Sequence, residues 1–388
     1  MLRGPGQATP IESAPVPDQT LRVLGVGDGR SRHFTRWARR LVARGYDVHI
    51  LSNRITDRPN ELDGITAHRL VELDPLLRVR GLRRFRVVPA VRKLGARLRA
   101  DVVHSHDLTP YGWWVARAGL QPLVVSPWGR DALVEARDDP EVRKLAREAV
   151  APGRLYVVNS AALERATVEL GVDPAKIRRS FWHANIDDFS PERADRAGLR
   201  ARFGWSGDTP LVLSVKNFRP YSNIDIVVRA FARVREEEPR ARLLSTAGGG
   251  WTRDETEALV DELGLRPYVV IHEFSGEEIP TVLASVDAVV MLAEVESSPA
   301  SLLESMASGA PLVCGIAPSI DEWVQQDEGA EVVPCRDVDA VAAAILRLLR
   351  EPERGRRYAE RNLREVHARF GDPGAELESV YEEVLAGI

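Results

Sequence analysis

The chain has 388 residues, more than one compact hydrophobic core usually holds, so its length favours two α/β domains of ordinary size. A hydrophobic share of 44% and a charged share of 28% are typical of a soluble globular protein, and the formal net charge of −4 offers no general attraction for nucleic acid. No apolar run approaches the roughly 18 residues of a membrane span, and the sequence shows no cluster of cysteine and histidine that would hold a metal ion.

The first 20 residues precede the first apolar segment. They contain four prolines and lack the apolar centre of a signal peptide, so we expect a disordered tail at residues 1–20 and a cytoplasmic protein. Cys314 and Cys335 lie in apolar runs, where buried free thiols are expected in a reducing compartment.

The first folded unit is predicted to be a strand, a glycine loop and a helix. Residues 21–26 are apolar, Gly27 and Gly29 follow, and helical periodicity then runs over residues 31–44. This order is typical of a nucleotide-binding opening, but the glycines lack the spacing of a dinucleotide fingerprint, so the pattern does not indicate NAD. His33 begins the helix, either as part of a ligand-binding face or as a solvated residue.

A basic amphipathic segment follows at residues 78–99. Apolar residues from Phe85 to Leu98 fall on one helical face, and most of the arginines lie elsewhere. We expect a helix that packs on the sheet with a solvated basic face. The alternative is a cationic patch for an anionic acceptor or for peripheral contact with a membrane.

Two further strands of the first domain end in side chains suited to sugar binding. Residues 101–105 run into His106, and a histidine at the carboxyl end of a parallel strand can exchange hydrogen bonds with a hydroxyl group near neutral pH. His104, two residues earlier, is expected to be structural. The next strand leads to Trp128 and Asp131, and this aspartate either holds an acceptor hydroxyl or caps the following helix.

The second domain is predicted to open with a strand at residues 211–216. Lys216 ends this strand and Arg219 follows it; a guanidinium suits phosphate oxygens well. Three glycines at 248–250 would let the backbone approach a ligand, although they equally form an ordinary turn. The Asp-Val-Asp sequence at 337–339 directly precedes a helix, so we interpret it as a cap and predict no metal there.

Residues 289–315 are the most informative unit of the chain: an apolar strand, a polar loop, a helix and a second apolar strand. Ser298 is the predicted N-cap and Pro299 the predicted first helical residue. A helix N-terminus at the carboxyl edge of a parallel sheet favours ligand binding. Glu296 and Glu304 bracket this end, and their carboxylates are suited to accepting hydrogen bonds from sugar hydroxyls.

The spacing Glu296-x7-Glu304, continued by Ser-Met-Ala-Ser-Gly-Ala-Pro-Leu-Val at 305–313, resembles the E-x7-E signature of the retaining GT-B glycosyltransferases of family 4. The segments GDGRSRHF, DVVHSHD and SPWGRD are similar to other segments of that family, the last to its WGSD loop, which lines the interdomain cleft. The resemblance implies transfer of a hexose-like sugar from a UDP- or GDP-type nucleoside diphosphate, with retention of configuration and with no metal or other cofactor. The acceptor would be a small molecule, a lipid-linked molecule or part of the cell envelope.

The implied fold is α/β GT-B, with two facing Rossmann-like domains, parallel sheets and a cleft between them. Residues 21–190 would form an acceptor-binding N-terminal domain and residues 191–371 a nucleotide-sugar-binding C-terminal domain. Residues 372–388 would form a helix that returns to the first domain.

The resemblance also implies residue roles. In the family the first glutamate of the signature faces the donor sugar, the second holds the ribose, and the histidine of DVVHSHD reaches the sugar. The residues expected to act in catalysis are therefore His106, Lys216 and Glu296. The expected donor-binding residues are Gly27, Gly29, Lys216, Arg219, Gly249, Glu296, Ser297, Ser298, Ala300, Ser301 and Glu304. The expected acceptor-binding residues are His33, Trp128 and Asp131.

The motif that binds the donor diphosphate in the family is altered in this chain. The family's G-R-L-x-x-x-K-G, whose two cations neutralise the donor diphosphate, has Lys216 here in place of the arginine and Tyr221 in place of the lysine. Arg219 is the candidate for the second charge. Two other functions therefore stay open: a GT-B-fold nucleotide-sugar epimerase or hydrolase, and a non-catalytic sugar-nucleotide-binding module.

Overall fold

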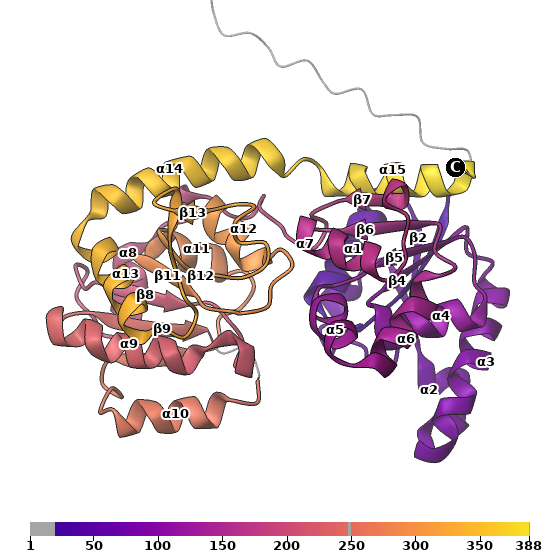
Figure 1. Cartoon of the computed structure of the whole chain (residues 1–388), viewed down its shortest axis with the longest axis horizontal. Helices are drawn as coiled ribbons and strands as arrows, with labels where there is room; N and C mark the ends of the chain where they lie inside the picture. The colour runs from indigo at the N-terminus through magenta and orange to yellow at the C-terminus, as the bar shows by residue number, and fades with distance from the viewer. Residues whose placement is uncertain (1–19, 247–249, 388) are drawn as a thin grey trace, which may run out of the picture.

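The computed structural model describes residues 20–246 and 250–387, so nearly all of the predicted tail and Gly249 lie outside the described residues. The described chain forms two lobes, each built on a parallel seven-stranded sheet with helices packed on it (Figure 1). The predicted α/β GT-B architecture of two Rossmann-like domains is confirmed.

The first sheet has the strand order β3-β2-β1-β4-β5-β6-β7. Since the order reverses between β1 and β4, the loops after these two strands diverge and leave a crevice at the carboxyl edge. The strands are β1 (Arg22–Val26), β2 (Asp47–Ser52), β3 (Ile65–Arg69), β4 (Val102–His106), β5 (Leu123–Ser126), β6 (Leu155–Val158) and β7 (Ile177–Arg179).

Helices cover both faces of this sheet because their apolar residues recur at helical spacing. In α1, Phe34, Trp37, Ala38 and Leu41 follow this spacing, and all four are fully buried. The helices of this lobe are α1 (Arg32–Ala43), α2 (Leu70–Leu73), α3 (Arg80–Leu98), α4 (Trp113–Ala118), α5 (Ala136–Asp138), α6 (Pro140–Val150) and α7 (Ala161–Glu169).

The second sheet repeats this plan with the order β10-β9-β8-β11-β12-β14-β13, reversing between β8 and β11. Its strands are β8 (Leu211–Ser214), β9 (Arg242–Thr246), β10 (Val269–His272), β11 (Ala288–Met291), β12 (Leu312–Gly315), β13 (Gln325–Gln326) and β14 (Gly329–Val333). Its helices are α8 (Arg196–Arg202), α9 (Ile224–Glu237), α10 (Arg253–Glu262), α11 (Ile279–Ser285), α12 (Ala300–Ala307), α13 (Val338–Arg350) and α14 (Pro352–Arg369).

The last helix, α15 (Pro373–Ala386), packs on the first lobe, while α14 stays with the second (Figure 1). Leu377, Val380 and Val384 of α15 join the core beside β1 and α1. The Tyr381 hydroxyl accepts a hydrogen bond from Trp37 Nε1 at 3.0 Å and contacts His104 Nδ1 at 2.7 Å. Helix α15 therefore packs against β4, the strand that ends in His106.

The predicted apolar face of α3 is wrong at its N-terminal end. Phe85 is 63% exposed, and Leu76, Val79 and Leu82 beside it are also exposed. The buried face runs through Val87, Val91 and Leu94, and at about 100° per residue Phe85 lies on the opposite side of the helix from them. We call the exposed apolar group Leu76, Val79, Leu82 and Phe85 the α3 patch.

No helix within residues 20–246 and 250–387 is both long enough and apolar enough to cross a membrane. Cys314 and Cys335 are buried free thiols, as expected. Asp337 accepts a hydrogen bond from the Ala340 backbone N–H at 2.9 Å, which confirms its predicted role as the cap of α13.

Candidate active site

The carboxyl edges of the two sheets meet at a contact region between the lobes. Ser297 Oγ donates to the Trp128 carbonyl at 3.1 Å, His183 Nε2 lies 2.7 Å from the Ser298 carbonyl, and Arg36 contacts Glu304 at 3.3 Å. These contacts join the loops after β5, β7 and β11 with α1 and α12. We call the region formed by Arg36, Trp128, His183, Ser297, Ser298 and Glu304 the seam.

A buried ion pair lies on the second lobe's side of the seam. Lys216, just after β8, hydrogen-bonds through Nζ to Glu296 Oε1 in the loop after β11. Their side chains are only 12% and 19% exposed. The strands before them flank the switch point of the second sheet, so the pair lies where ligands bind in open parallel sheets.

Glu304 lies on α12, and its side chain is 14% exposed. Burial raises the pKa of this carboxyl to about 7, although Arg36 and Lys216 both favour the ionised form. Arg36 Nη1 also donates to the His183 carbonyl at 2.8 Å. An arginine of the first lobe therefore contacts the carboxylate that the sequence assigned to the ribose.

Helix α12 begins one residue later than predicted. Pro299 is its N-cap and Ala300 its first residue, because the Pro299 backbone is extended, with ψ of 120°. Ser298 is therefore not the N-cap, and its buried hydroxyl has no hydrogen-bond partner among the described residues. The Ser301 hydroxyl contacts Met291 Sδ at 3.6 Å. The donor-binding roles of these residues stay predictions.

His106 is fully buried at the end of β4, enclosed by aromatic rings. Ring centroids of Trp37, His104 and Trp182 lie 4.5, 4.3 and 4.9 Å from its own. Neither ring nitrogen has a hydrogen-bond partner among the described residues. Burial holds the pKa of His106 well below its usual value, so the imidazole is neutral.

His104 differs from His106 in having both ring nitrogens satisfied. They contact Ser126 Oγ and the Tyr381 hydroxyl, each at 2.7 Å. The predicted structural role of His104 is confirmed.

Further polar atoms without partners gather around His106. Within the part of the chain that the structure describes, Trp128 Nε1 and His183 Nδ1 lack hydrogen bonds, as does the Ser298 hydroxyl. The Trp128 and His106 ring centroids are 6.0 Å apart, and His183 contacts Ser298 directly. Buried polar groups usually find partners, so these atoms are available to ordered water or to a ligand.

His33 belongs to the same region and is not a solvated residue. Its Nδ1 lies 2.8 Å from the His183 carbonyl, and its ring stands edge-on to Trp128 with centroids 6.3 Å apart. Burial, followed by the nearby Arg36 charge, lowers the pKa of His33 to about 4. A neutral His33 therefore lies at the seam, and its acceptor-binding role stays a prediction.

The other predicted first-lobe residues have local structural contacts. Asp131 is buried, and its oxygens accept hydrogen bonds from the backbone N–H groups of Leu108, Trp128 and Gly129 at 2.8–3.2 Å. Asp131 therefore does not cap the helical turn that follows, whose N-cap is Arg130, and instead holds the loop that precedes it. The N–H groups of Gly27 and Gly29 donate to Leu51 O and Ser52 Oγ, at 3.2 and 2.9 Å. No contact described for these three residues tests ligand binding.

A Cβ at Gly27 would lie 3.0 Å from the His106 Cβ, so a larger residue there would need the His106 side chain to shift. In the second lobe, the Arg219 guanidinium lies over the exposed Trp251 ring, 4.7 Å from its centroid. Arg219 as the second diphosphate cation stays a prediction.

Sequence reasoning missed Arg36, Trp182 and His183. The tandem Trp-His follows the last strand of the first sheet, a position where ligand-facing residues gather. Arg36 lies three residues after His33, on the same helical face. The position of the Trp-His pair and the spacing of Arg36 from His33 can both be read from the sequence. Neither indicates a site by itself, because the contacts across the seam join segments that are distant in the sequence.

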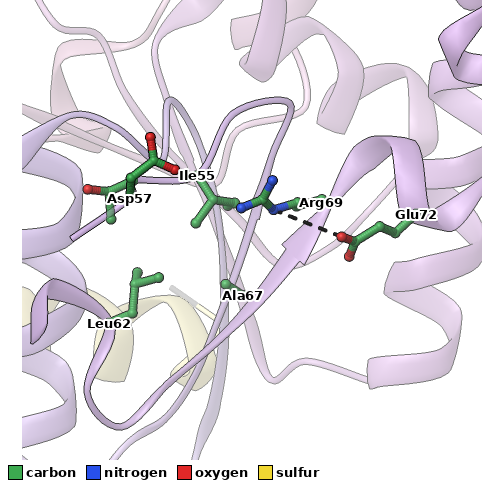
Figure 2. Close-up of a pocket in the computed structure, with 7 residues that line it drawn as sticks. Ile55, Asp57, Leu62, Ala67, Arg69 and Glu72 are labelled. Carbon is green, nitrogen blue, oxygen red and sulfur yellow. Dashed lines mark ion pairs between the residues drawn. The ribbon is translucent and has the colours of Figure 1, made fainter. Parts of the chain in front are cut away.

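A separate pocket of about 500 Å³ lies on the first lobe, along the edge strand β3 (Figure 2). Its lining includes Asp57, Ala67, Arg69 and Glu72, with Arg69 and Glu72 3.9 Å apart. β3 is the outermost strand, away from the β1/β4 switch point. The candidate site is therefore the seam and not this pocket.

Two family models match the chain, one in each lobe. The model described as Glycosyltransferase Family 4 matches residues 27–179, and the model described as Glycosyl transferases group 1 matches residues 195–365. The first match includes Arg36 and Trp128, the second includes Ser297, Ser298 and Glu304, and His183 lies between the two matched ranges. Residues 27–179 are thus of the Glycosyltransferase Family 4 type and residues 195–365 of the group 1 glycosyl transferase type, which supports a glycosyltransferase with the GT-B fold.

Individual relatives agree with this assignment. The chain is 30% identical over 277 residues to the GDP-mannose-dependent alpha-(1-6)-phosphatidylinositol monomannoside mannosyltransferase of Mycolicibacterium smegmatis, a match that covers 69% of this chain and 64% of that enzyme. It is 24% identical over 361 residues to the N-acetyl-alpha-D-glucosaminyl L-malate synthase of Bacillus anthracis, covering 90% and 93%. Anabaena HepE, solved in complex with UDP and glucose, shares the fold with a TM-score of 0.77 and 16% identity, covering 95% of this chain and all of that one.

Proposed function

We propose that this protein transfers a sugar from a UDP- or GDP-type nucleoside diphosphate to an acceptor hydroxyl, with retention of configuration. The observation that carries the proposal is the seam, where the buried Lys216–Glu296 pair lies with Glu304 in the second lobe, and His106 ends β4 in the first. The relative from Mycolicibacterium smegmatis is GDP-mannose-dependent and HepE was solved with UDP, which supports a nucleotide-sugar donor.

The chemistry we propose divides between the two lobes. Lys216 neutralises the departing diphosphate, Glu304 holds the ribose, and Glu296 accepts hydrogen bonds from sugar hydroxyls. His106, neutral and without partners, receives a sugar hydroxyl from the other side. The bond from the anomeric carbon to the diphosphate breaks, the bond to the acceptor oxygen forms on the same face, and the acceptor proton passes to the leaving phosphate. Both lobes must close on the donor for this step.

We propose further that the acceptor is lipid-linked and that the protein meets it at an anionic membrane surface. The α3 patch supports this, because Phe85 and its neighbours expose apolar side chains beside arginines such as Arg84, whose guanidinium lies 4.6 Å from the Phe85 ring centroid. Residues 75–100 contain eight arginines and one lysine but no acidic residue. A cationic surface with apolar side chains suits such a membrane.

The test is a thermal-shift titration of the protein with UDP, GDP, TDP and ADP, each with and without magnesium. A ligand at a hundredfold excess over its Kd stabilises the folded state by about 2.7 kcal/mol. We expect one nucleotide to stabilise the protein without magnesium. Glu304→Ala should lose this effect, whereas Glu169→Ala, at an exposed position on α7, should keep it.

Three outcomes would contradict the proposal. Absence of any stabilisation would remove the nucleotide site. Release of free sugar or an epimer from the nucleotide sugar without an acceptor would favour the hydrolase or epimerase. Nucleotide binding with no turnover across acceptors would favour the binding module.

A further inference from the structure

Arg130 of the first lobe stacks on Tyr221 of the second lobe. Arg130 lies in the loop after β5, and Tyr221 lies in a short 3-10 turn, Pro220–Ser222, after β8. The Arg130 guanidinium carbon is 5.4 Å from the Tyr221 ring centroid. Glu135 holds the same guanidinium from its own lobe, with Nε donating to Oε1 at 2.8 Å.

Each of these residues stands where the chain departs from a family motif. Tyr221 occupies the position of the lysine in G-R-L-x-x-x-K-G, so this chain lacks a cation there. Arg130 occupies the position of the serine in the WGSD loop, so the chain gains a cation there. The two departures lie about 90 residues apart in the sequence, yet their side chains contact each other.

The surroundings of the contact belong to the donor side of the seam. The Tyr221 carbonyl accepts a hydrogen bond from the Glu294 N–H at 3.0 Å, which ties its turn to the loop that carries Glu296. Gly129, next to Arg130, packs so closely on that loop that a Cβ would lie 2.7 Å from Ser297 Oγ. Arg130 is therefore fixed beside the loop whose Glu296 pairs with Lys216.

We propose that Arg130, in place of Arg219, supplies the second cation for the donor diphosphate, reaching from the first lobe and stacking on Tyr221. This inference depends on the proposed function. A guanidinium suits the role because it is planar, stacks on an aromatic ring and still directs N–H groups at phosphate oxygens. Because Lys216 and Arg130 come from different lobes, both cations contact the diphosphate only when the two lobes are in contact with each other.

The test restores the family's residue at position 130, at position 221, or at both. The variants are Arg130→Ser, Tyr221→Lys and the double variant Arg130→Ser/Tyr221→Lys, with Arg137→Ser as control; Arg137 is an exposed arginine of the same lobe, paired with Asp138. Calorimetry measures the affinities for UDP or GDP, whichever stabilises the wild type, and for the corresponding monophosphate and nucleoside. Arg130→Ser should weaken diphosphate binding about tenfold, with the nucleoside unchanged. The double variant should recover to within about threefold of the wild type.

The outcomes separate this inference from the proposed function. If the wild type binds no nucleoside diphosphate, the proposed function fails. If the wild type binds but Arg130→Ser behaves as Arg137→Ser does, Arg130 is not a diphosphate ligand. Equal losses for nucleoside and diphosphate would make Arg130 merely structural. If the double variant binds the diphosphate as weakly as Arg130→Ser does, a lysine at position 221 does not replace the charge of Arg130.

Discussion

The two lobes share the order of their first five strands but present different chemistry at their facing edges. The first lobe ends in neutral rings, the buried His106 and the partly buried Trp128 among them, while the second ends in the Lys216–Glu296 pair and Glu304. A charge in a poorly hydrated seam interacts more strongly than one in water. The difference teaches that the same fold can place an ion pair at one facing edge and neutral aromatic rings at the other.

The largest effect should come from removing charge on the second lobe's edge. Lys216→Ala leaves Glu296 buried without its cation and removes the proposed neutralising group, so we expect nucleotide-sugar turnover to fall about a hundredfold or more. Steady-state kinetics measures this, with the exposed Lys176→Ala as the matched control. If turnover by Lys216→Ala lies within a factor of two of that control, Lys216 does not neutralise the diphosphate.

At the edge of the first lobe, we expect a substitution that lowers turnover to raise the stability of the fold. His106→Phe keeps a ring in the aromatic enclosure but removes two unpaired nitrogens, whose burial costs about 1–3 kcal/mol. We expect the Tm to rise by about 2–4 °C for each kcal/mol recovered. Turnover should fall at least about tenfold because the sugar loses a contact.

His104→Phe is the control for this prediction. It breaks the hydrogen bonds to Ser126 and Tyr381, so it should lower the Tm. Differential scanning calorimetry distinguishes the two variants. A lower Tm for both would mean that the His106 nitrogens are satisfied in solution, and full activity of His106→Phe would remove His106 from the site.

The second lobe's candidate site was predictable because it is local in sequence. Glu296 and Glu304 lie in one strand-loop-helix unit, so their spacing already places both at one helix end. The first lobe's candidate site depends on contacts between distant segments. Arg36 and Glu304 are 268 residues apart, and no periodicity reports such a pairing.

The error at α3 is one of periodicity. Phe85 lies nine residues before Leu94, which at about 100° per residue places it on the opposite side of the helix. The buried face begins at Val87, which joins Val91 and Leu94 in the core of the lobe. Parallel strands ending in Lys216 and His106 were predictable because apolar runs between helical segments favour a parallel sheet.

Protonation of Glu304 gives a finer test of the charged edge. Its pKa of about 7 in the folded state lies above the ordinary value of 4.5, so the folded protein binds this proton more tightly than the unfolded chain does. The stability present below pH 4.5 is therefore lost progressively as the pH rises towards 7. Nucleotide affinity should change in the opposite direction, increasing severalfold as the carboxylate ionises and accepts ribose hydroxyls.

Glu304→Gln cannot ionise and should lose both pH dependences. Thermal melts and nucleotide titrations between pH 5 and about 8 compare it with the wild type. Identical pH profiles for the two proteins would mean that another group titrates in this range.

The smallest expected effect on stability comes from a substitution in the α3 patch of the first lobe. Phe85→Asp should alter stability by less than about 0.5 kcal/mol, because Phe85 is 63% exposed. It should nevertheless weaken binding to vesicles that contain anionic lipid, since it removes an apolar side chain and introduces a negative charge among the arginines. Co-sedimentation measures this loss, with Val168→Asp on α7 as the control for an exposed apolar residue outside the α3 patch. Equal vesicle binding by both variants would leave the first lobe with one functional surface, the seam, and would favour an acceptor that arrives from solution.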